Sequence, residues 1–351
     1  MNTLEHLISD IPCPDTEARS QARERWDSLV KPRGSLGRLE DLAVQIAGIT
    51  GELDPSLERK TIALFAGDHG VMDEGVSPYP QAVTGLMVRN FLTGGAGINV
   101  LARAAGARVK VIDIGMKEDI GDAPGLVRRN VRRGTRNMVK GPAMTRKETE
   151  AAMDVGVEMA EQAFETGVGM VATGEMGIGN TTPSSAVLSA LLPADVEAMT
   201  GRGTGLNDAG LQHKTDVIRR ALEVNAHSLE GPLSTLSALG GLEIAGICGL
   251  CIGGAARRMV VVVDGFISTA GALVAMRLNP KVKDYLIFSH LSSEKGHQPF
   301  FEKEGIRPLL DLDLRLGEGT GAALAMQIIE NSIRVYREMA TFEEAGITPG
   351  A

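Results

Sequence analysis

Short apolar runs alternate with longer segments of helical spacing along most of this chain. At least five runs have the length and the content of β-branched residues that are typical of buried strands, and the segments between them repeat apolar residues at helical intervals. The predicted strands are residues 61–66, 109–114, 168–172, 259–263 and 284–289. This alternation predicts a Rossmann-like α/β fold, in which a parallel sheet has helices on both faces.

Polar or glycine residues follow each of the predicted strands. These clusters are Gly67-Asp68-His69, Asp113 with Gly115, Gly174-Glu175, Asp264-Gly265 and Ser289-His290. In an open parallel sheet the ligand crevice lies at the carboxyl ends of the strands. We therefore expect a ligand site where these clusters lie.

The helical patterns near the two ends of the chain fall outside the alternation. Residues 16–30 are amphipathic and include Trp26, and residues 322–339 have helical spacing. We expect the two segments to pack together in a small helical subdomain, made of residues 1–30 and 322–351. A large α/β catalytic domain would then span residues 31–321.

Residues 168–185 combine an apolar strand, a glycine-rich turn and the start of a helix. Gly174, Gly177 and Gly179 let the backbone turn and approach a ligand closely. Asn180 or one of the two threonines after it can cap the helix, whose free N–H groups form an anion site. Glu175 adds a carboxylate to the turn, which indicates chemistry; the alternative is a solvated loop residue in a turn that only the glycines require.

Two more glycine turns contain candidate functional residues. The turn 201–205, which includes Gly203, precedes Lys214, and together they predict a phosphate clamp with the lysine as a point charge. Glu318 stands between two glycines just before the last predicted helix. The apolar run before Glu318 predicts partial burial, which would raise its pKa and make it a better general base. Helix capping is the structural alternative for Glu318.

The loop 77–86 is long enough to cover a pocket. It contains prolines, which stiffen it, and Tyr79, which offers a flat apolar surface. An apolar slot of this kind suits an aromatic heterocycle, although it distinguishes poorly between close relatives of its ligand.

Composition and charge exclude several classes of protein. The chain has 351 residues, 43% of them hydrophobic and 3% aromatic, with a net charge of −8. The acidic total argues against nucleic acid as a partner, because phosphate backbones require a positive surface. The most basic stretch, residues 128–136, is therefore expected to form an exposed loop or hairpin. The N-terminal residues lack a secretory signal, and we expect a cytoplasmic protein.

Residues 236–256 are predicted to form one buried helix of small residues. Its Cys248 and Cys251 could bind a metal or form a redox pair, but no second pair accompanies them, and burial is the simpler interpretation. Glu243 and Arg257 interrupt the apolar run, which is too short to span a membrane.

Histidines and one glutamate follow the last predicted strand. His290, Glu294 and His297, with His69, could form a metal site. Their spacing does not match the patterns that place metal ligands on one helical face, so we expect no metal.

Six motifs, in order over nearly the whole chain, resemble those of a known family. They are KPRGSLGRLE, AGDHGVMDEGVSPYP, GEMGIGNTT, GRGTGL with His213-Lys214, SHLSSEKGH and LDLRLGEGTGAALA. The resemblance is to the nicotinate-nucleotide:dimethylbenzimidazole phosphoribosyltransferases of cobalamin lower-ligand synthesis. It implies transfer of the phosphoribosyl group of nicotinate mononucleotide to 5,6-dimethylbenzimidazole, which gives α-ribazole 5′-phosphate and nicotinate with inversion at the anomeric carbon. It also implies a homodimer without a metal or organic cofactor.

The resemblance also assigns roles to single residues. The family's catalytic base falls on Glu318, and Glu175 falls near the nucleotide, where it would steady the ribose or the developing oxocarbenium charge. The base pocket falls on the loop 77–86, where family members vary, so the preferred base stays open. The substrate-binding candidates are Ser77, Tyr79, Leu86, Gly174, Gly177, Gly203, Lys214 and Ser292.

Two other functions stay open from the residues alone. The strand–helix alternation is typical of dinucleotide-dependent oxidoreductases, although GDHG follows the first strand where G-x-G-x-x-G would be expected. A non-catalytic nucleotide-binding or sensor protein would be favoured if Glu318 and Glu175 proved dispensable.

Overall fold

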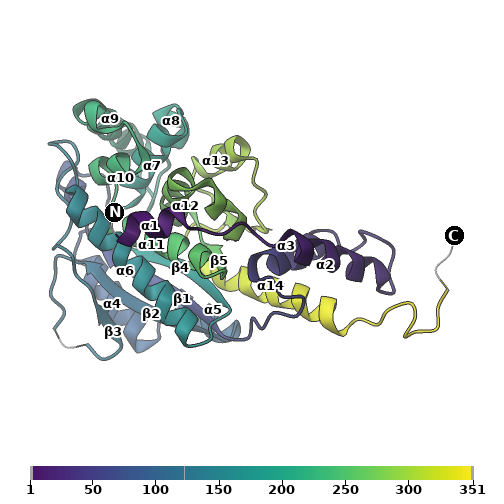
Figure 1. Cartoon of the computed structure of the whole chain (residues 1–351). Helices are drawn as coiled ribbons and strands as arrows, with labels where there is room; N and C mark the ends of the chain where they lie inside the picture. The colour runs from purple at the N-terminus through teal and green to yellow at the C-terminus, as the bar shows by residue number, and fades with distance from the viewer. Residues whose placement is uncertain (1–2, 122, 349–351) are drawn as a thin grey trace.

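A parallel sheet forms the centre of the molecule. Figure 1 shows the computed structural model, which describes residues 3–121 and 123–348. The sheet has six strands in the order β3-β2-β1-β4-β5-β6. They are β1 (Lys60–Gly67), β2 (Ala107–Gly115), β3 (Leu126–Arg128), β4 (Met170–Met176), β5 (Val260–Val263) and β6 (Leu286–Phe288). This is the strand order of a doubly wound sheet whose direction of winding switches between β1 and β4, and it confirms the predicted Rossmann-like α/β fold.

Helices cover both faces of the sheet. Two of them, α4 (Val83–Thr93) and α5 (Gly97–Ala104), connect β1 to β2, whereas α11 (Leu242–Ala256) precedes β5 on the path from β4. The two connections run in opposite directions along the sheet. Because crossovers between parallel strands are right-handed, their helices lie on opposite faces.

The other elements complete the two layers and the ends of the fold (Figure 1). The remaining α-helices are α1 (Thr3–Ser9), α2 (Thr16–Ser28), α3 (Arg38–Thr50), α6 (Arg146–Glu165), α7 (Thr181–Leu191), α8 (Val196–Met199), α9 (Asp208–Val224), α10 (Pro232–Leu239), α12 (Phe266–Leu278), α13 (His297–Glu304) and α14 (Thr320–Glu338). Short 3₁₀ helices are η1 (Gly70–Glu74), η2 (Ala226–Ser228) and η3 (Pro280–Tyr285), and β7 (His290–Leu291) pairs with β8 (Leu310–Asp311) in a second small sheet.

Glycine allows the outer helix α6 to pack closely on α11. A β-carbon at Gly156 of α6 would overlap the carbonyl of Gly246, and one at Gly249 of α11 would overlap the carbonyl of Met153. The two backbones therefore touch, which buries α11 completely between α6 and the sheet.

All five predicted strands are present, although their bounds differ from the predicted ones by one to four residues, and two of these differences change an interpretation. The predicted turn at Gly174 and Glu175 is wrong, because β4 continues to Met176 and pairs Glu175 with Phe65 of β1. The first two residues of the predicted strand 284–289 belong instead to η3. The sequence did not predict β3, which has only three residues.

The single helix predicted for residues 236–256 is also wrong, because two helices occupy the region. Gly240 and Gly241 have extended backbones between α10 and α11. Two glycines in succession disfavour helix, so the chain breaks there. Cys248 and Cys251 are buried as predicted, and burial raises the pKa of Cys251 to about 12.

At the right of Figure 1, α2, α3 and the C-terminal half of α14 project together from the sheet. The rings of Trp26 and Tyr336 meet edge to face with centroids 5.4 Å apart, and Leu29 pairs with Thr341. The segments before residue 31 and after residue 321 therefore touch. The division into two domains at these residues stays a proposal, and α3 packs with α2 and α14 although it lies within 31–321.

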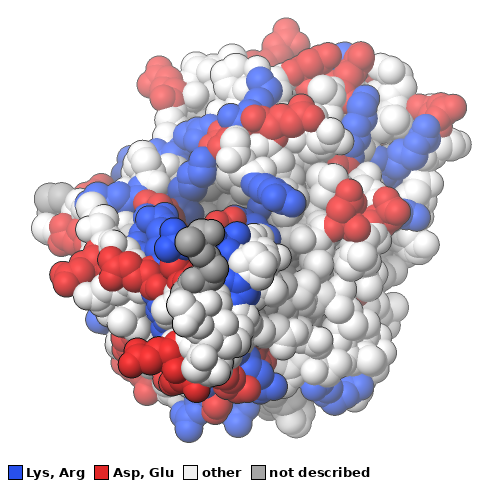
Figure 2. Space-filling model, turned by 90° about the vertical axis from the view of Figure 1, so that its right-hand side faces the viewer, with Lys and Arg blue, Asp and Glu red and all other residues white. Residues whose placement is uncertain are grey.

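Charges of both signs share the surface. Figure 2 views the molecule from the side on which α2, α3 and α14 project, and its basic and acidic side chains are interspersed, notably along the upper edge. In the basic stretch 128–136, Arg129, Arg133 and Arg136 form ion pairs with Glu158, Asp119 and Glu148. The stretch runs parallel to β2 in its first residue and is irregular afterwards, so it is not a hairpin. Across residues 3–121 and 123–348, no helix has the length and apolar character that a membrane crossing requires.

Candidate active site

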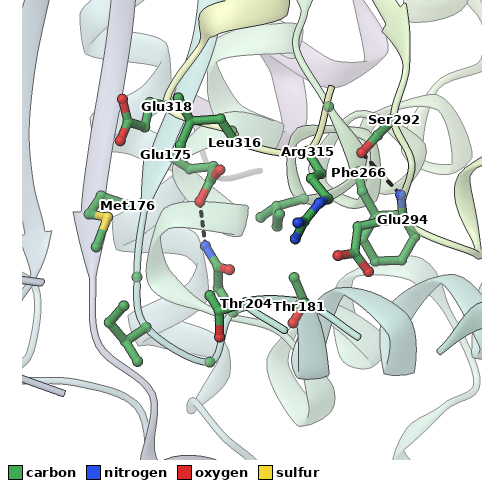
Figure 3. A pocket seen from close by; sticks show the side chains of 18 of the residues that line it. Glu175, Met176, Thr181, Thr204, Phe266, Ser292, Glu294, Arg315, Leu316 and Glu318 are labelled. Carbon is green, nitrogen blue, oxygen red and sulfur yellow. Dashed lines mark hydrogen bonds between the residues drawn. The ribbon is translucent and has the colours of Figure 1, made fainter. Parts of the chain in front are cut away.

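A cavity of about 680 Å³ opens at the carboxyl ends of the strands, where the winding of the sheet changes direction. Its wall combines the loop after β1, the turn between β4 and α7, the turn 201–205, the start of α12 and the segment 313–318. Seven predicted site residues line it: Ser77, Tyr79, Glu175, Gly177, Gly203, Ser292 and Glu318. Figure 3 shows this cavity, with Glu175 and Glu318 on one side and Ser292 and Glu294 on the other.

Three predicted residues are not part of the cavity wall. Leu86 is 61% exposed, Gly174 lies in the sheet under the segment that carries Glu318, and Lys214 is buried behind Thr181. A role for Leu86 in binding would require that α4 or its own side chain move toward the cavity.

Glu318 lies in a run of three residues with left-handed backbone. The φ angles of Gly317, Glu318 and Gly319 are 78°, 64° and 94°. For a residue with a side chain this conformation costs about 1–2 kcal/mol. Strain that surrounding structure maintains is typical of functional sites, so the backbone of Glu318 is itself a reason to assign it a role.

The surroundings of Glu318 raise its pKa. The side chain is 6% exposed, and its Oε2 accepts a 3.4 Å hydrogen bond from the amide of Ile98, in the first turn of α5. Burial raises the pKa of Glu318, and the charge of Asp264 adds to this, although the bond from Ile98 opposes them. A carboxylate with a raised pKa is a better proton acceptor near neutral pH.

Glu175 is buried at the end of β4, so the interpretation of it as a solvated loop residue is wrong. Its Oε2 accepts a hydrogen bond from the side chain of Asn180, and Figure 3 shows the carboxyl group turned toward that amide and away from the Glu318 carboxylate. Burial, followed by the charge of Asp264, raises the pKa of Glu175 to about 8. At pH 7 this carboxyl group is therefore mostly protonated.

Asn180, one of three residues predicted as possible caps, is the N-cap residue of α7 but does not cap the helix through its side chain. It precedes α7, but its side chain makes no capping bond to that helix and binds Glu175. The residues from Gly177 to Thr181 line the cavity, so the start of α7 faces it. An anion that reached this point would meet backbone N–H groups.

Lys214 joins the two glycine turns from behind the cavity wall. Its Nζ donates hydrogen bonds to Thr181 Oγ1 at 2.8 Å and to the carbonyl of Gly201 at 3.1 Å. A β-carbon at Gly203 would lie 3.5 Å from that Nζ. Burial lowers the pKa of Lys214 to about 8. Lys214 therefore holds the two turns in place, and its charge lies behind the cavity wall without direct contact with the cavity.

Ser292 is held in place by a buried histidine. The Ser292 amide donates a 2.8 Å hydrogen bond to His297 Nδ1, and Nε2 of the same ring lies 3.0 Å from Thr269 Oγ1. Burial, with the nearby His290, lowers the pKa of His297 well below its usual value. Within residues 3–121 and 123–348, no group of three or more His, Cys, Asp or Glu side chains is placed to hold a metal ion.

His69, from the GDHG cluster, lies behind the turn rather than in the cavity wall. Its Nε2 is 2.8 Å from Glu243 Oε1, and both side chains are buried. A β-carbon at Gly177 would lie 3.1 Å from the same imidazole nitrogen, so the turn packs directly on this ion pair. Burial disfavours the charged imidazole, but Glu243 outweighs it and raises the pKa of His69.

Several wall residues were not predicted. Arg202, Arg315 and Phe266 line the cavity, as does Glu294, which the sequence suggested only as a possible metal ligand. Arg202 and Arg315 stand inside or next to glycine turns that were noted for Lys214 and Glu318, and Phe266 follows the strand-end pair Asp264-Gly265. The proximity of these positions to strand ends and turns was the available signal.

The chain matches known proteins over nearly its whole length. A family model described as phosphoribosyltransferase matches residues 11–347. A nicotinate-nucleotide–dimethylbenzimidazole phosphoribosyltransferase of Geobacter sulfurreducens is 55% identical over 351 residues, which cover 100% of this chain and 99% of that protein. The protein of the same name from Chlorobium chlorochromatii is 54% identical over 345 residues, 98% of each chain. The crystal structure of CobT from Thermus thermophilus has a TM-score of 0.91 and 47% identity, and covers 95% of this chain and 100% of that one.

Proposed function

The chain belongs to the nicotinate-nucleotide–dimethylbenzimidazole phosphoribosyltransferase family, and from this premise we propose that it transfers the 5-phosphoribosyl group of nicotinate mononucleotide to 5,6-dimethylbenzimidazole. The products are α-ribazole 5′-phosphate and nicotinate, with inversion at the anomeric carbon. The observation that carries the proposal is the pair of buried glutamates, Glu318 and Glu175, in the wall of one nucleotide-sized cavity.

One general base is enough for this reaction. One benzimidazole nitrogen attacks the anomeric carbon while the bond from that carbon to the pyridinium nitrogen breaks. The leaving nicotinate takes the bonding electrons and loses its positive charge, so it needs no acid. The other benzimidazole nitrogen must lose its proton, and we assign its acceptance to Glu318, whose raised pKa and position in the wall support the role.

Glu175 suits a different role in the same reaction. With a pKa of about 8 it is neutral at pH 7 and can donate a hydrogen bond to a ribose oxygen. A neutral carboxyl group stabilises an oxocarbenium ion poorly, so the second role expected for Glu175 requires that its carboxyl group ionise in the complex. The pyridinium charge of the bound mononucleotide would lower this pKa and favour the anion only in the complex.

The 5′-phosphate fits best at the start of α7, beside Gly177, Gly203 and Ser292. These residues line the cavity near the N-terminus of α7. The amides of Asn180, Thr182 and Ser184 already donate to carbonyl groups, so an anion would bind the amides of Gly179 and Thr181. Lys214 supplies positive charge from behind, and Arg202 and Arg315 supply it from the wall itself. The carboxylate of Glu294 also lines the cavity and interacts with the charge of Lys214, whereas Arg202 forms an ion pair with Asp208.

The heterocyclic base fits against the loop that follows η1. Ser77 and Tyr79 line the cavity there together with Val83 and Met87, which gives a mainly apolar slot. A methyl group in such a slot is worth only ~1–3 kcal/mol. We therefore expect unsubstituted benzimidazole to be turned over as well, at a rate that competition assays against dimethylbenzimidazole would measure. If benzimidazole were not turned over at all, the site would have to contain a hydrogen-bonding group that distinguishes the substituted ring from the unsubstituted one.

We also propose that the protein acts as a cytoplasmic homodimer without a metal or organic cofactor. Sedimentation of the purified protein would give its oligomeric state. Turnover that persists after treatment with a chelator and dialysis would support the absence of a cofactor, and activity restored only by added metal would contradict it.

The decisive experiment is a single incubation of the protein with nicotinate mononucleotide and dimethylbenzimidazole. Chromatography should detect nicotinate and α-ribazole 5′-phosphate in equal amounts, and neither product without the base. A dinucleotide-dependent oxidoreductase or a non-catalytic nucleotide-binding protein would release no nicotinate, and that result would reject the proposed function.

A further inference from the structure

Asp264 connects the end of β5 to the segment that carries Glu318. Its Oδ2 accepts a 3.0 Å hydrogen bond from the amide of Gly319, and its Oδ1 accepts one of 2.9 Å from the amide of Ala322. Both carboxylate oxygens thus bind the start of α14, which lies beside β4 and β5 in Figure 1. Gly319, the residue before α14, has no side chain to make these bonds.

Asp264 is itself fixed to the sheet. Its amide donates a 3.0 Å hydrogen bond to Thr173 Oγ1 of β4, and its carbonyl accepts one of 3.1 Å from the hydroxyl of Ser289 after β6. The side chain is 1% exposed and does not belong to the cavity wall. A continuous set of contacts therefore leads from three neighbouring strands through one carboxylate to the backbone beside Glu318.

The left-handed run at Gly317, Glu318 and Gly319 needs such a contact to persist. Without it, the segment could relax to ordinary backbone angles, and the Glu318 carboxylate would turn away from its place in the wall. The bond from Gly319 acts on the residue directly after Glu318. Displacement of a catalytic group by about 1 Å is sufficient to slow a reaction strongly.

We propose that Asp264 is a positioning residue, which holds the Gly317–Glu318–Gly319 backbone so that Glu318 faces the proton of the incoming base. The inference rests on the proposed function, because it requires Glu318 to be the general base. Asp264 acts through Glu318 and touches no substrate.

Asp264→Asn is the first test. The amide oxygen of asparagine can accept one of the two backbone bonds, whereas its NH₂ group would face an N–H donor. We expect kcat to fall by about 10- to 100-fold, while the KM for nicotinate mononucleotide changes by less than about two-fold. A fall in stability without this split between kcat and KM would indicate a structural role only and would overturn the inference.

A double-mutant cycle separates this inference from the proposed function. In the Glu318→Gln background, Asp264→Asn should cause no further loss of kcat, because the group that it positions is gone. If Glu318→Gln is slow and Asp264→Asn slows it again by the same factor, the positioning role is wrong and the base assignment stands. If Glu318→Gln itself turns over at the wild-type rate, the base assignment has failed.

The pH profile provides a second readout. The titratable groups near Glu318 are Asp264, Glu175 and, at the cavity wall, His290, while Glu243 stands beyond Glu175. Loss of the Asp264 charge should move the acid limb of kcat/KM to lower pH, because the pKa of Glu318 falls. An unmoved acid limb would contradict the coupling of the two carboxylates.

Two further variants protect the test from a failure to fold. Ala322→Pro removes the N–H that binds Asp264 Oδ1, in the first turn of α14, and leaves the charge of Asp264 in place. Because Ala322 is buried and the proline ring adds atoms there, circular dichroism must first show that the variant folds. Like Asp264→Asn, it should lower kcat, but without a change in charge. If the variant folds and its kcat is unaltered, the inference is overturned. Asp113→Asn is the matched control, since the Asp113 carboxylate binds the Met116 amide and the Asn130 side chain away from the cavity, and its kcat should stay unchanged.

Discussion

Glu318 and Glu175 are neighbours in one cavity wall, yet their surroundings separate their chemistry. Glu318 accepts a single long hydrogen bond, from the Ile98 amide, whereas Glu175 lies deeper and has a pKa of about 8. Pairs of carboxyl groups whose environments differ in this way commonly divide the roles of proton acceptor and neutral partner. This difference supports the proposed assignment of Glu318 as the base.

Glu318→Gln should abolish most of the activity. Glutamine keeps the shape of the side chain and cannot accept the proton, so we expect kcat to fall by ~10² to 10⁴. Circular dichroism should show little change in folding, because the left-handed backbone does not depend on the carboxylate charge. Near-normal kcat in steady-state assays of nicotinate release would transfer the role to Glu175 or to solvent.

Lys214→Ala should weaken the binding of nicotinate mononucleotide more than the binding of the benzimidazole base. The substitution removes the bonds to Thr181 and Gly201 and the charge behind the phosphate site. Loss of a charged contact of this kind is worth about 1.5–3 kcal/mol, roughly a ten- to hundred-fold rise in KM for nicotinate mononucleotide. Rate measurements in which the concentration of each substrate is varied separately would give the two KM values. An unchanged KM for the mononucleotide would remove Lys214 from the phosphate site.

Single residues were predictable where chemistry and glycine turns coincide. Glu318 and Glu175 stand out because each is a carboxylate beside glycines near the end of a strand, whereas Ser292 was assigned by the family resemblance alone; all three line the cavity. The bonds from Asp264 to α14 were not predictable, since they join residues more than fifty positions apart in the chain. Pattern and spacing describe neighbours in sequence, whereas these contacts arise from the order of the strands.

At the scale of elements, the start of α6 explains much of the basic stretch before it. Thr145 and Glu148 form a capping box, with the Glu148 amide 3.2 Å from Thr145 Oγ1 and the Thr145 amide 2.7 Å from Glu148 Oε2. Arg136 adds hydrogen bonds of 2.6 and 3.1 Å to the same carboxylate. The arginine is therefore part of the support of a helix.

Glu148→Ala should destabilise the protein by about 1–2 kcal/mol, through loss of the cap and of the partly exposed ion pair. Arg136, followed by other contacts that outweigh partial burial, lowers the pKa of Glu148 to about 2. Because the folded value is lower than the ordinary one of 4.5, this stability is present above pH 4.5 and is lost as the pH falls toward 2. Urea unfolding of both proteins at pH 7 and pH 3 would measure it; an equal difference at the two pH values would contradict the ionic contribution.

Helix and strand boundaries show where prediction from sequence fails. The long run 236–256 contains so many apolar residues that its periodicity cannot reveal the break at Gly240 and Gly241. In β4 the glycine and glutamate resemble a turn, but pairing with β1 extends the strand through them. Both errors have one cause: tertiary contacts override local preference.

At the scale of the whole molecule, the alternation of strands and helices was enough to predict the fold and the edge on which the cavity lies. Which strands neighbour one another was not predicted, and the sheet order places β4 beside β1 across the switch in direction. This arrangement also concentrates carboxyl groups, because Glu175, Asp264, Asp68 and Glu318 all lie at the same edge. Burial raises the pKa values of Glu175, Asp68 and Glu318, so we expect the folded protein to lose stability as the pH rises.

Glu175 should make the stability of the whole protein fall as the pH rises. Burial and Asp264 raise its pKa from 4.5 to about 8 in the folded state, so its contribution is fully present below pH 4.5 and is lost as the pH rises through 8. Between these values one such group changes the free energy of unfolding by up to about 1.4 kcal/mol for each pH unit. Urea unfolding at pH 5.5 and 8 should show a smaller decline in Glu175→Gln than in the parent protein. Parallel declines would show that Glu175 ionises normally.

The left-handed run at Gly317, Glu318 and Gly319 also has a stereochemical consequence. Positive φ angles are strained for L-amino acids and relaxed for their mirror images. An L-alanine at Gly319 would combine that strain with a β-carbon 2.8 Å from Ile62 Cγ2. A D-alanine, introduced by chemical ligation, keeps the φ of 94° without backbone strain. At the proposed base and at the residue on each side of it, therefore, the backbone follows the geometry of the opposite hand, and a mirror-image building block would fit its torsion angles better than any encoded residue with a side chain.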